Sequence, residues 1–264
     1  MRFASLGSGS AGNCMVIEQA SLVSTTRLLL DCGFGVSELV KRLQRLDLAP
    51  EQITGILVTH EHDDHAKGAF KFAAKYGVPV WLSHGSLKMC ERYFPEKAAD
   101  KAKITLNIID SHSKFVIEHI EITPYPVPHD AREPTQFTFT DGQSKLGVLT
   151  DAGSSTQHIE QVLSGCDALV LECNHDLNML ENGAYPYSLK KRVGSRLGHL
   201  DNASAAQLLA ILDNTKLKHI IAAHLSAKNN TPALAKNALS QALNCEHDWV
   251  GIAAQDAGFA WRSF

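Results

Sequence analysis

The chain has 264 residues, of which 44% are hydrophobic and 20% are charged, and its formal net charge is −3. These values are typical of a globular protein with one large or two small cores, and nothing in the global charge requires a nucleic-acid partner, although a local patch can still bind one. No long Pro/Gly/Ser linker divides the chain, so we expect a single domain over 1–264. No stretch is long enough to span a bilayer, and the N-terminus lacks a signal-peptide core, which predicts a cytoplasmic protein that contacts no membrane.

Short apolar runs of strand length recur along the chain, at 14–17, 27–32, 53–59, 78–83, 120–127, 135–140, 145–150, 168–172, 219–224 and 259–261. Between them, apolar residues at helical spacing predict helices over 36–46, 66–76, 201–212 and 232–243. Strand-rich stretches with helices in both halves of the chain predict an α/β fold in which two sheets are enclosed by helices.

The six cysteines and thirteen histidines carry further information. The cysteines have no CxxC spacing, and several lie in apolar runs, which predicts buried thiols in a reducing compartment. Thirteen histidines are many for 264 residues, and histidine is the commonest metal ligand. The composition therefore favours metal chemistry.

The densest cluster of candidate ligands directly follows the apolar run 53–58, in the sequence Thr-His-Glu-His-Asp-Asp-His. It places His60, His62, Asp64 and His65 within six residues. These positions are not spaced for one helical face, so we expect a loop at the end of a buried strand. Imidazole nitrogens suit Zn, Mn or Fe, and a carboxylate adds a harder, charge-neutralising ligand. The segment therefore predicts a metal site.

Three more candidate ligands stand where predicted strands end, namely His129, Asp151 and His224. A rigid sheet can hold side chains at its strand ends in a fixed geometry. Together with the first four residues they make seven ligands, which is enough for two metal ions that share one carboxylate.

The pattern HxHxDH, followed by His, Asp and His at strand ends, resembles the metallo-β-lactamase superfamily over nearly the whole chain. The resemblance implies an αββα sandwich of two mixed sheets flanked by helices. It also implies that Asp151 bridges two ions and that Asp31 orients a metal-binding histidine. The implied ligands are His60, His62 and His129 for one ion, and Asp64, His65 and His224 for the other.

Departures from other members of the superfamily narrow the chemistry. The true lactamases have Cys where this chain has Asp151, and flavodiiron-type proteins have Glu where it has His62. Antibiotic hydrolysis and oxygen reduction are therefore not expected. Thioesterases of the glyoxalase type share all seven ligands and stay open as an alternative.

An ordered series of motifs in the second half, Leu-Glu-Cys-Asn-His-Asp at 171–176, Gly-His-Leu-Asp-Asn at 198–202 and Ala-His-Leu-Ser at 223–226, resembles the YycJ (WalJ) family. That family is regarded as single-strand-active DNA exonucleases, and ribonuclease Z and the phosphonate-operon cyclic phosphodiesterase are its neighbours. The usual motif has Ser where this chain has Asp201. Both residues are good helix N-caps, so the difference changes little.

The resemblance assigns roles to residues around the metals. His199 is expected to begin a helix, whose positive end would lower its pKa, and to stabilise or protonate the leaving oxygen. His175 either contacts the substrate phosphate or supports the ligand loops. The remaining candidates for supporting the ligands or contacting substrate are Asn13, Asn174 and Ser226.

Features near the expected site bear on the substrate. Too few residues separate Asp151 from His199 for a β-CASP insertion, and the arm with which ribonuclease Z grips tRNA is missing. The aromatic and basic stretch 185–196 can stack bases and contact a backbone, or it can be an ordinary solvated helix face. Lys67, Lys71 and Lys75 are spaced to extend a basic rim, with the same alternative.

These observations predict a phosphodiester hydrolase that depends on two divalent ions, Zn or Mn, and acts as an exonuclease on single-stranded DNA. Asp64 is expected to orient or accept a proton of the attacking water. The alternatives are a small cyclic-phosphodiester hydrolase, a glyoxalase-like thioesterase and a non-catalytic nucleic-acid-binding protein. RNA as the substrate and a homo-oligomeric state stay open.

Overall fold

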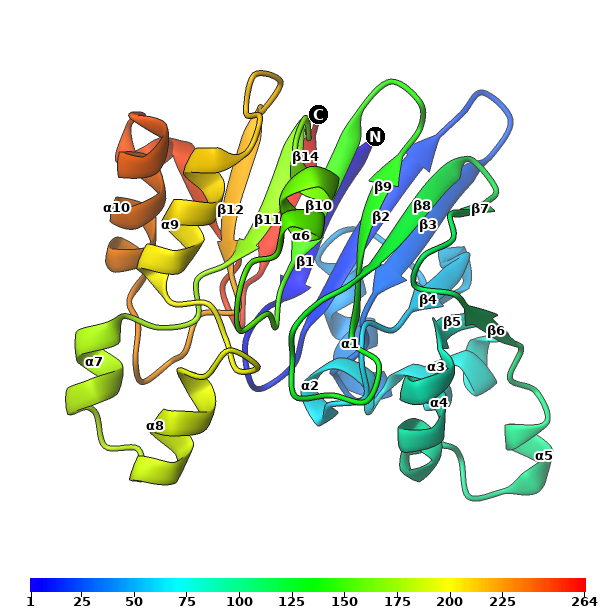
Figure 1. Ribbon diagram of the computed structural model, residues 1–264. Coiled ribbons are helices and arrows are strands. Elements are labelled where there is room, and N and C mark those ends of the chain that lie inside the picture. Colours follow the sequence, from blue (N-terminus) through cyan, green and yellow to red (C-terminus); the bar gives the residue numbers. More distant parts are fainter.

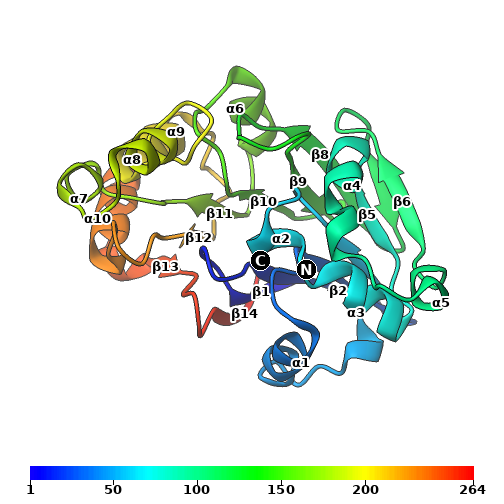
Figure 2. The same cartoon turned by 90° about the horizontal axis from the view of Figure 1, so that it is seen from below.

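A computed structural model describes residues 1–264 and contains two seven-stranded sheets packed face to face, with helices on their outer faces (Figures 1 and 2). The first sheet has the order β14-β1-β2-β3-β4-β5-β6, and the second has the order β13-β12-β11-β10-β9-β8-β7. The predicted αββα sandwich is confirmed.

Each sheet is antiparallel on one side and parallel on the other. The strands of the first sheet are β1 (Arg2–Gly7), β2 (Cys14–Ala20), β3 (Thr25–Leu30), β4 (Gly55–Leu57), β5 (Val80–Ser83), β6 (Leu106–Ile109) and β14 (Phe259–Ser263). Those of the second are β7 (Phe115–Ile117), β8 (Ile120–Pro126), β9 (Thr135–Thr140), β10 (Lys145–Leu149), β11 (Ala168–Glu172), β12 (His219–Ala223) and β13 (Val250–Ile252).

Helices cover the outer faces of the sheets and the edge where the predicted ligands lie. They are α1 (Val36–Gln44), α2 (Asp63–Ala66), α3 (Ala69–Tyr76), α4 (His84–Cys90), α5 (Ala98–Lys101), α6 (Gln157–Leu163), α7 (Leu177–Asn182), α8 (Tyr187–Val193), α9 (Asn202–Ile211) and α10 (Pro232–Leu243). Short 3-10 helices occupy η1 (Pro50–Gln52), η2 (Glu91–Tyr93) and η3 (His247–Trp249). None of these helices is both long and apolar enough to cross a bilayer.

Three hydrophobic clusters hold these layers together. The central one joins the inner faces of the sheets, with Phe3 and Ile17 from the first sheet against Phe137 and Phe139 from the second. The other two lie between each sheet and its helices. Parallel strands such as β11 are buried on both faces, which explains why their sequences are continuously apolar.

All ten predicted strands coincide with strands of the structure, but β1, β6, β7 and β13 were not among the predicted runs. The strands β6, β7 and β13 are three or four residues long, and both β6 and β7 expose part of their length, so no apolar run marks these three. Of the predicted helices, 232–243 is correct, whereas the helix predicted over 66–76 begins only at Ala69, because Gly68 separates α3 from α2. A Cβ at Gly68 would lie 1.9 Å from the carbonyl oxygen of Phe34, so only glycine permits this close approach.

A buried carboxylate ties three strands of the first sheet together. Glu18 on β2 lies 2.5 Å from Nε of Arg2 on β1 and 2.6 Å from Nε of Arg27 on β3. Burial raises the pKa of Glu18, but the two guanidinium groups outweigh it and hold this pKa below its usual value. The ionised carboxylate therefore stabilises the fold above the unfolded-state pKa of about 4.3, and this stabilisation is lost as the pH falls through the lower folded-state pKa.

Glu18→Gln is expected to lower the free energy of unfolding by about 1–3 kcal/mol at pH 7, because it removes two hydrogen bonds to charged groups. Urea unfolding at pH 7 and at pH 3 measures the effect, and the difference from wild type should shrink at pH 3. The matched control is Glu121→Gln, at an exposed carboxylate 3.0 Å from Lys114, which should change stability by less than about 0.5 kcal/mol. Equal effects of the two substitutions would contradict the prediction.

Candidate metal centre

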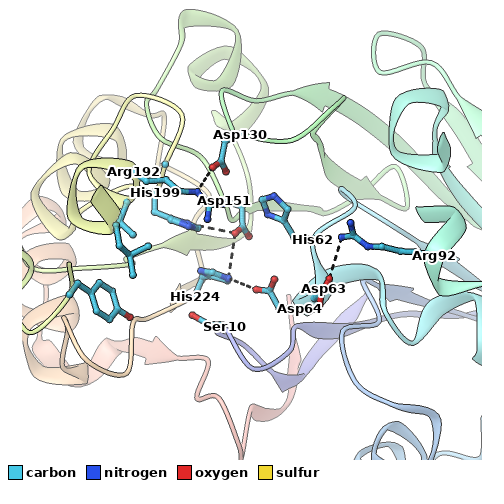
Figure 3. A pocket seen from close by; sticks show the side chains of 14 residues that line it. Ser10, His62, Asp63, Asp64, Arg92, Asp130, Asp151, Arg192, His199 and His224 are labelled. Carbon is cyan, nitrogen blue, oxygen red and sulfur yellow. Dashed lines mark hydrogen bonds and ion pairs between the residues drawn. The ribbon is translucent and has the colours of Figure 1, made fainter. Parts of the chain in front are cut away.

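The seven predicted ligands converge at one edge of the sandwich, where β4, β8, β10 and β12 end. Their ligand atoms form overlapping groups within 4.8 Å of one another. His60 and His62 follow β4, while Asp64 and His65 lie on α2, a single helical turn rather than the predicted loop. Residues from both halves of the chain therefore build one cluster (Figure 3).

The first group consists of His60, His62 and His129. Nδ1 of His62 lies 3.0 Å from Nε2 of His60 and 3.3 Å from Nε2 of His129. Nitrogens about 2.0–2.1 Å from a tetrahedral ion lie about 3.3 Å apart. The nitrogens of the three imidazoles are therefore spaced as ligands of one tetrahedral ion would be.

The second group consists of Asp64, His65 and His224. Oδ2 of Asp64 is 3.4 Å from Nε2 of both histidines. Asp151 lies between the two groups: its Oδ2 is 3.1 Å from Nε2 of His65, and its Oδ1 is 3.4 Å from Nε2 of His224 and 4.0 Å from Nε2 of His129. Asp151 thus occupies the place of a shared ligand.

The electrostatics of this cluster suit cations. The side chain of Asp151 is 2% exposed, and with the proton of His65 on Nδ1, where it bonds Asp31, the Oδ2 atom of Asp151 accepts no hydrogen bond. This arrangement is costly for a buried anion without a counter-charge. Burial raises the pKa values of Asp64 and Asp151, but the neighbouring His65 and His224 outweigh it and hold both below their usual range. Five imidazoles and two ionised carboxylates therefore fit two divalent ions of borderline softness.

Hydrogen bonds on the far side of the imidazoles direct their free nitrogens into the cluster. Nδ1 of His65 is 2.8 Å from Oδ2 of Asp31, and Nδ1 of His129 is 2.9 Å from the carbonyl oxygen of Gly198. The Thr59 hydroxyl donates to Asp31 and accepts from Nδ1 of His60, 2.9 Å away. Each of these rings then has its proton on Nδ1 and a lone pair on Nε2. The structure places Asp31 where the sequence predicted it, whereas the role of Thr59 was not predicted.

Three residues of the site adopt a left-handed backbone conformation, namely Asp31 with φ 61°, Asp151 with φ 53° and His224 with φ 54°. Asp31 and His224 directly follow β3 and β12, and Asp151 lies two residues after the last residue of β10. This conformation is uncommon for residues other than glycine, and such strain concentrates at functional sites. Here it turns each strand end so that its side chain joins the cluster.

Asp31→Asn is expected to weaken metal binding about 10–100-fold, because the amide cannot match the carboxylate in fixing the orientation of His65. Asn tolerates the left-handed backbone, so the fold should persist. Competition with a chromophoric chelator measures the affinity for Zn. Asp47→Asn is the matched control, since Asp47 has φ 57° but is exposed and away from the cluster. An unchanged affinity of the Asp31 variant would contradict the orienting role.

The other predicted supporting residues surround the second group. Nδ2 of Asn13 donates to Oδ2 of Asp64 over 3.2 Å. The side-chain Nδ2 of Asn174 donates to the carbonyl oxygen of His224 over 3.0 Å, and the backbone carbonyl oxygen of Asn174 accepts from the backbone N–H of Ser226 over 2.7 Å. His175 is 1% exposed and lies outside the cavity lining. Of its two predicted roles, the position of His175 favours support of the ligand loops.

His199 lies beside the cluster in a loop rather than at the start of a helix, so this part of the prediction is wrong. Helix α9 begins at Asn202 and is capped by the side chain of Asp201, as predicted for that residue. Nδ1 of His199 is 2.8 Å from Oε1 of Glu172 and 3.6 Å from Oδ1 of Asp151. Burial lowers the pKa of His199, but Glu172 and Asp151 outweigh it and raise this pKa, contrary to the expected decrease.

Glu172 is a component of the site that was not predicted. Its side chain is fully buried at the end of β11, and its Oε2 accepts hydrogen bonds from the backbone N–H groups of Ala152 (2.9 Å) and Leu200 (3.2 Å). The sequence feature that could have identified Glu172 is a carboxylate at the last position of an otherwise apolar strand. Glu172 thereby holds His199 in a fixed orientation toward the cavity.

A cavity of about 370 Å³ opens above the cluster. Arg92 and Arg192 lie on opposite sides of it (Figure 3), where Nη2 of Arg92 is 3.2 Å from Oδ1 of Asp63 and Nε of Arg192 is 2.5 Å from Oδ2 of Asp130. The lining residues are Ser10, His62, Asp63, Asp64, Arg92, Asp130, Asp151, Tyr185, Leu189, Arg192, Val193, Gly198, His199 and His224. The basic side chains that line the cavity itself are these two arginines, and none of Lys67, Lys71 and Lys75 reaches its lining.

The fold and this site define a metal-dependent hydrolase. Residues 26–224 match the Beta-lactamase superfamily domain, and the chain belongs to that family. It is 34% identical over 253 residues to exodeoxyribonuclease YycJ of Bacillus anthracis, covering 96% of this chain and 93% of that one. It is 31% identical to exodeoxyribonuclease WalJ of Streptococcus pneumoniae, covering 91% and 89%. The resemblance to the YycJ/WalJ branch is thus confirmed.

Solved structures agree on the fold. The metallo-β-lactamase fold protein YhfI from Bacillus subtilis superposes with a TM-score of 0.73 at 16% identity, covering 99% of both chains. A diphosphatase of the PhnP family superposes with a TM-score of 0.69, also at 16% identity, covering 100% of this chain and 97% of that one. At 16% sequence identity the likeness concerns the fold, that is, the arrangement of the two sheets.

Proposed function

We propose that the protein is an exonuclease that hydrolyses phosphodiester bonds of single-stranded DNA with two divalent metal ions, Zn or Mn. The observation that carries this proposal is the cavity itself, in which a seven-ligand cluster lies between two arginines. The relatives named as exodeoxyribonucleases, which align over more than nine-tenths of this chain, support the same substrate class. The six unpaired cysteines support a cytoplasmic location.

His60, His62 and His129 would hold one ion, Asp64, His65 and His224 the other, and Asp151 would bridge them. When bound, such ions activate water and neutralise charge on the reacting phosphate. Two carboxylates and five neutral imidazoles leave a residual positive charge on the pair of ions, which suits an anionic substrate.

The chain's own groups then position and protonate the substrate. Arg92 and Arg192 face the cavity from opposite sides and can bind phosphate oxygens on either side of the scissile bond. Tyr185 and Leu189 form an aromatic and apolar wall against which a base can stack. Asp64 orients or accepts a proton of the attacking water, and His199, held by Glu172, protonates the leaving oxygen.

A panel of substrates tests the proposal on protein loaded with Zn or with Mn. It comprises bis(p-nitrophenyl) phosphate, a glutathione thioester and 5′- and 3′-labelled oligonucleotides in single- and double-stranded form. Release of mononucleotides from one end of the single strand is the expected result. Thioester hydrolysis without cleavage of any phosphodiester would reject the proposal, and cleavage only within the strand would reject the exonuclease mode.

A further inference from the structure

Positive charge is concentrated beside the cavity. The segment 67–103 contains eight Lys or Arg residues but three Asp or Glu, so it carries a local charge of +5 in a chain whose net charge is −3. This segment begins directly after α2 and forms α3, β5, α4, η2 and α5, on the side of the cavity where Arg92 lies (Figures 1 and 3). Such an asymmetry is the electrostatic signature of a surface that binds a polyanion.

Within this segment, a groove of about 400 Å³ is lined by Lys71, Lys75 and Lys103. Asp100 supplies the one carboxylate in its lining and pairs with Lys103, Nζ to Oδ1 2.7 Å. Lys71 and Lys75 are exposed and form no ion pair. Like-charged ammonium groups that face one groove without matching carboxylates repel one another, and a bound anionic chain would relieve that repulsion.

The groove and the cavity are joined by the short helix η2. Arg92 lines the cavity, and Pro95, three residues later, lines the groove, so the chain between them spans at most about 11 Å. Phe94 packs against Phe70 of α3 with ring centroids 4.4 Å apart, which holds this connection on the helix that carries Lys71 and Lys75. A strand with its end in the cavity therefore reaches the groove within a few nucleotides.

We infer that the groove formed by Lys71, Lys75 and Lys103 binds the phosphate backbone of the DNA strand beyond the nucleotides held in the cavity. This inference rests on the proposed function and adds a second binding surface to it. Lysine ammonium groups contact phosphates as point charges without reading sequence, and each contact releases a counterion. The groove would therefore raise the affinity for long strands of any sequence and leave the chemical step unchanged.

The test compares the variant K71Q/K75Q/K103Q with a control of equal charge, K114Q/K216Q/K218Q. Lys216 and Lys218 precede β12, at the opposite end of the strand from His224, and none of the three control lysines lines the cavity or the groove. We measure kcat/KM on single strands of 4 and 20 nucleotides between 50 and 200 mM salt, together with hydrolysis of bis(p-nitrophenyl) phosphate.

The groove variant is expected to lose about tenfold or more in kcat/KM on the long strand at low salt, with little change on the short strand or on bis(p-nitrophenyl) phosphate. The slope of log(kcat/KM) against log(salt) should become shallower by about 2, at about 0.7 per lost phosphate contact on a single strand. A groove variant that behaves like the control would overturn the inference but not the proposed function. A wild-type protein that cleaves bis(p-nitrophenyl) phosphate and neither binds nor cuts either strand would overturn both.

Discussion

Asp151→Asn is expected to lower the metal content from two ions per chain to at most one, and to slow hydrolysis of bis(p-nitrophenyl) phosphate about a thousandfold or more. Metal ions contribute several kcal/mol of transition-state stabilisation, and each 1.4 kcal/mol corresponds to tenfold in rate. Asp151 has oxygens facing both groups: its Oδ1 lies 4.0 Å from Nε2 of His129 in the first group, and its Oδ2 lies 3.1 Å from Nε2 of His65 in the second. Its loss therefore affects both ions rather than one.

Asn is the most informative replacement at this position. It has nearly the same volume as Asp, and it tolerates the left-handed conformation that Asp151 adopts at φ 53°. A loss of activity can then be assigned to the missing charge rather than to misfolding. Elemental analysis of the purified protein measures the metal, and Asp47→Asn, which shares the backbone conformation outside the site, should retain both metal and activity. Full activity of the Asp151 variant would refute the bridging role.

The convergence of the seven proposed ligands could be predicted from the sequence because metal-binding side chains and strand ends are both local signals. The cluster at 60–65 is too dense in metal-binding side chains to be missed, and His129, Asp151 and His224 each follow an apolar run that ends abruptly. Because parallel strands of one sheet present their carboxyl ends at the same edge, separate strand ends imply proximity.

The groups that act around the metals could not be predicted in the same way. Glu172 reads as an ordinary strand terminus, and its importance arises only when β11 is paired beside β12 and the loop that carries His199 folds back over it. Arg192 lies in the basic stretch 185–196 that the sequence singled out, whereas Arg92, a hundred residues away, carries no motif. Their place on opposite sides of one cavity follows from packing of η2 and α8 around the sheet edge, and no spacing in the chain encodes it.

Errors at element boundaries have a similar origin. The helical periodicity of 66–76 is real, but the close approach of Gly68 to the backbone at Phe34 divides the segment into two helices. His199 was expected at a helix start, but the N-cap is Asp201, so the helix begins at Asn202 and His199 lies in the loop before it. The pKa of His199 then depends on the charges of Glu172 and Asp151 rather than on a helix end.

His199→Ala is expected to retain both metal ions and to slow cleavage of DNA by about 10²–10⁴-fold, the usual contribution of a general acid. Its effect should depend on the leaving group. The alkoxide that leaves from DNA needs a proton, whereas p-nitrophenolate is stable without one, so hydrolysis of bis(p-nitrophenyl) phosphate should fall far less. His158→Ala, at an exposed histidine on α6, serves as the matched control.

Glu172→Gln extends this test to the residue that positions the imidazole. Nδ1 of His199 is 2.8 Å from Oε1 of Glu172, and the neutral amide would weaken both the orientation of the ring and its attraction for a proton. The variant should therefore show a smaller loss than His199→Ala, with the same dependence on the leaving group. Loss of metal from the His199 variant would instead make His199 a ligand, and equal losses on both substrates would exclude proton donation. The ratio of the two rates thus separates a proton donor from a residue that only supports the fold of the site.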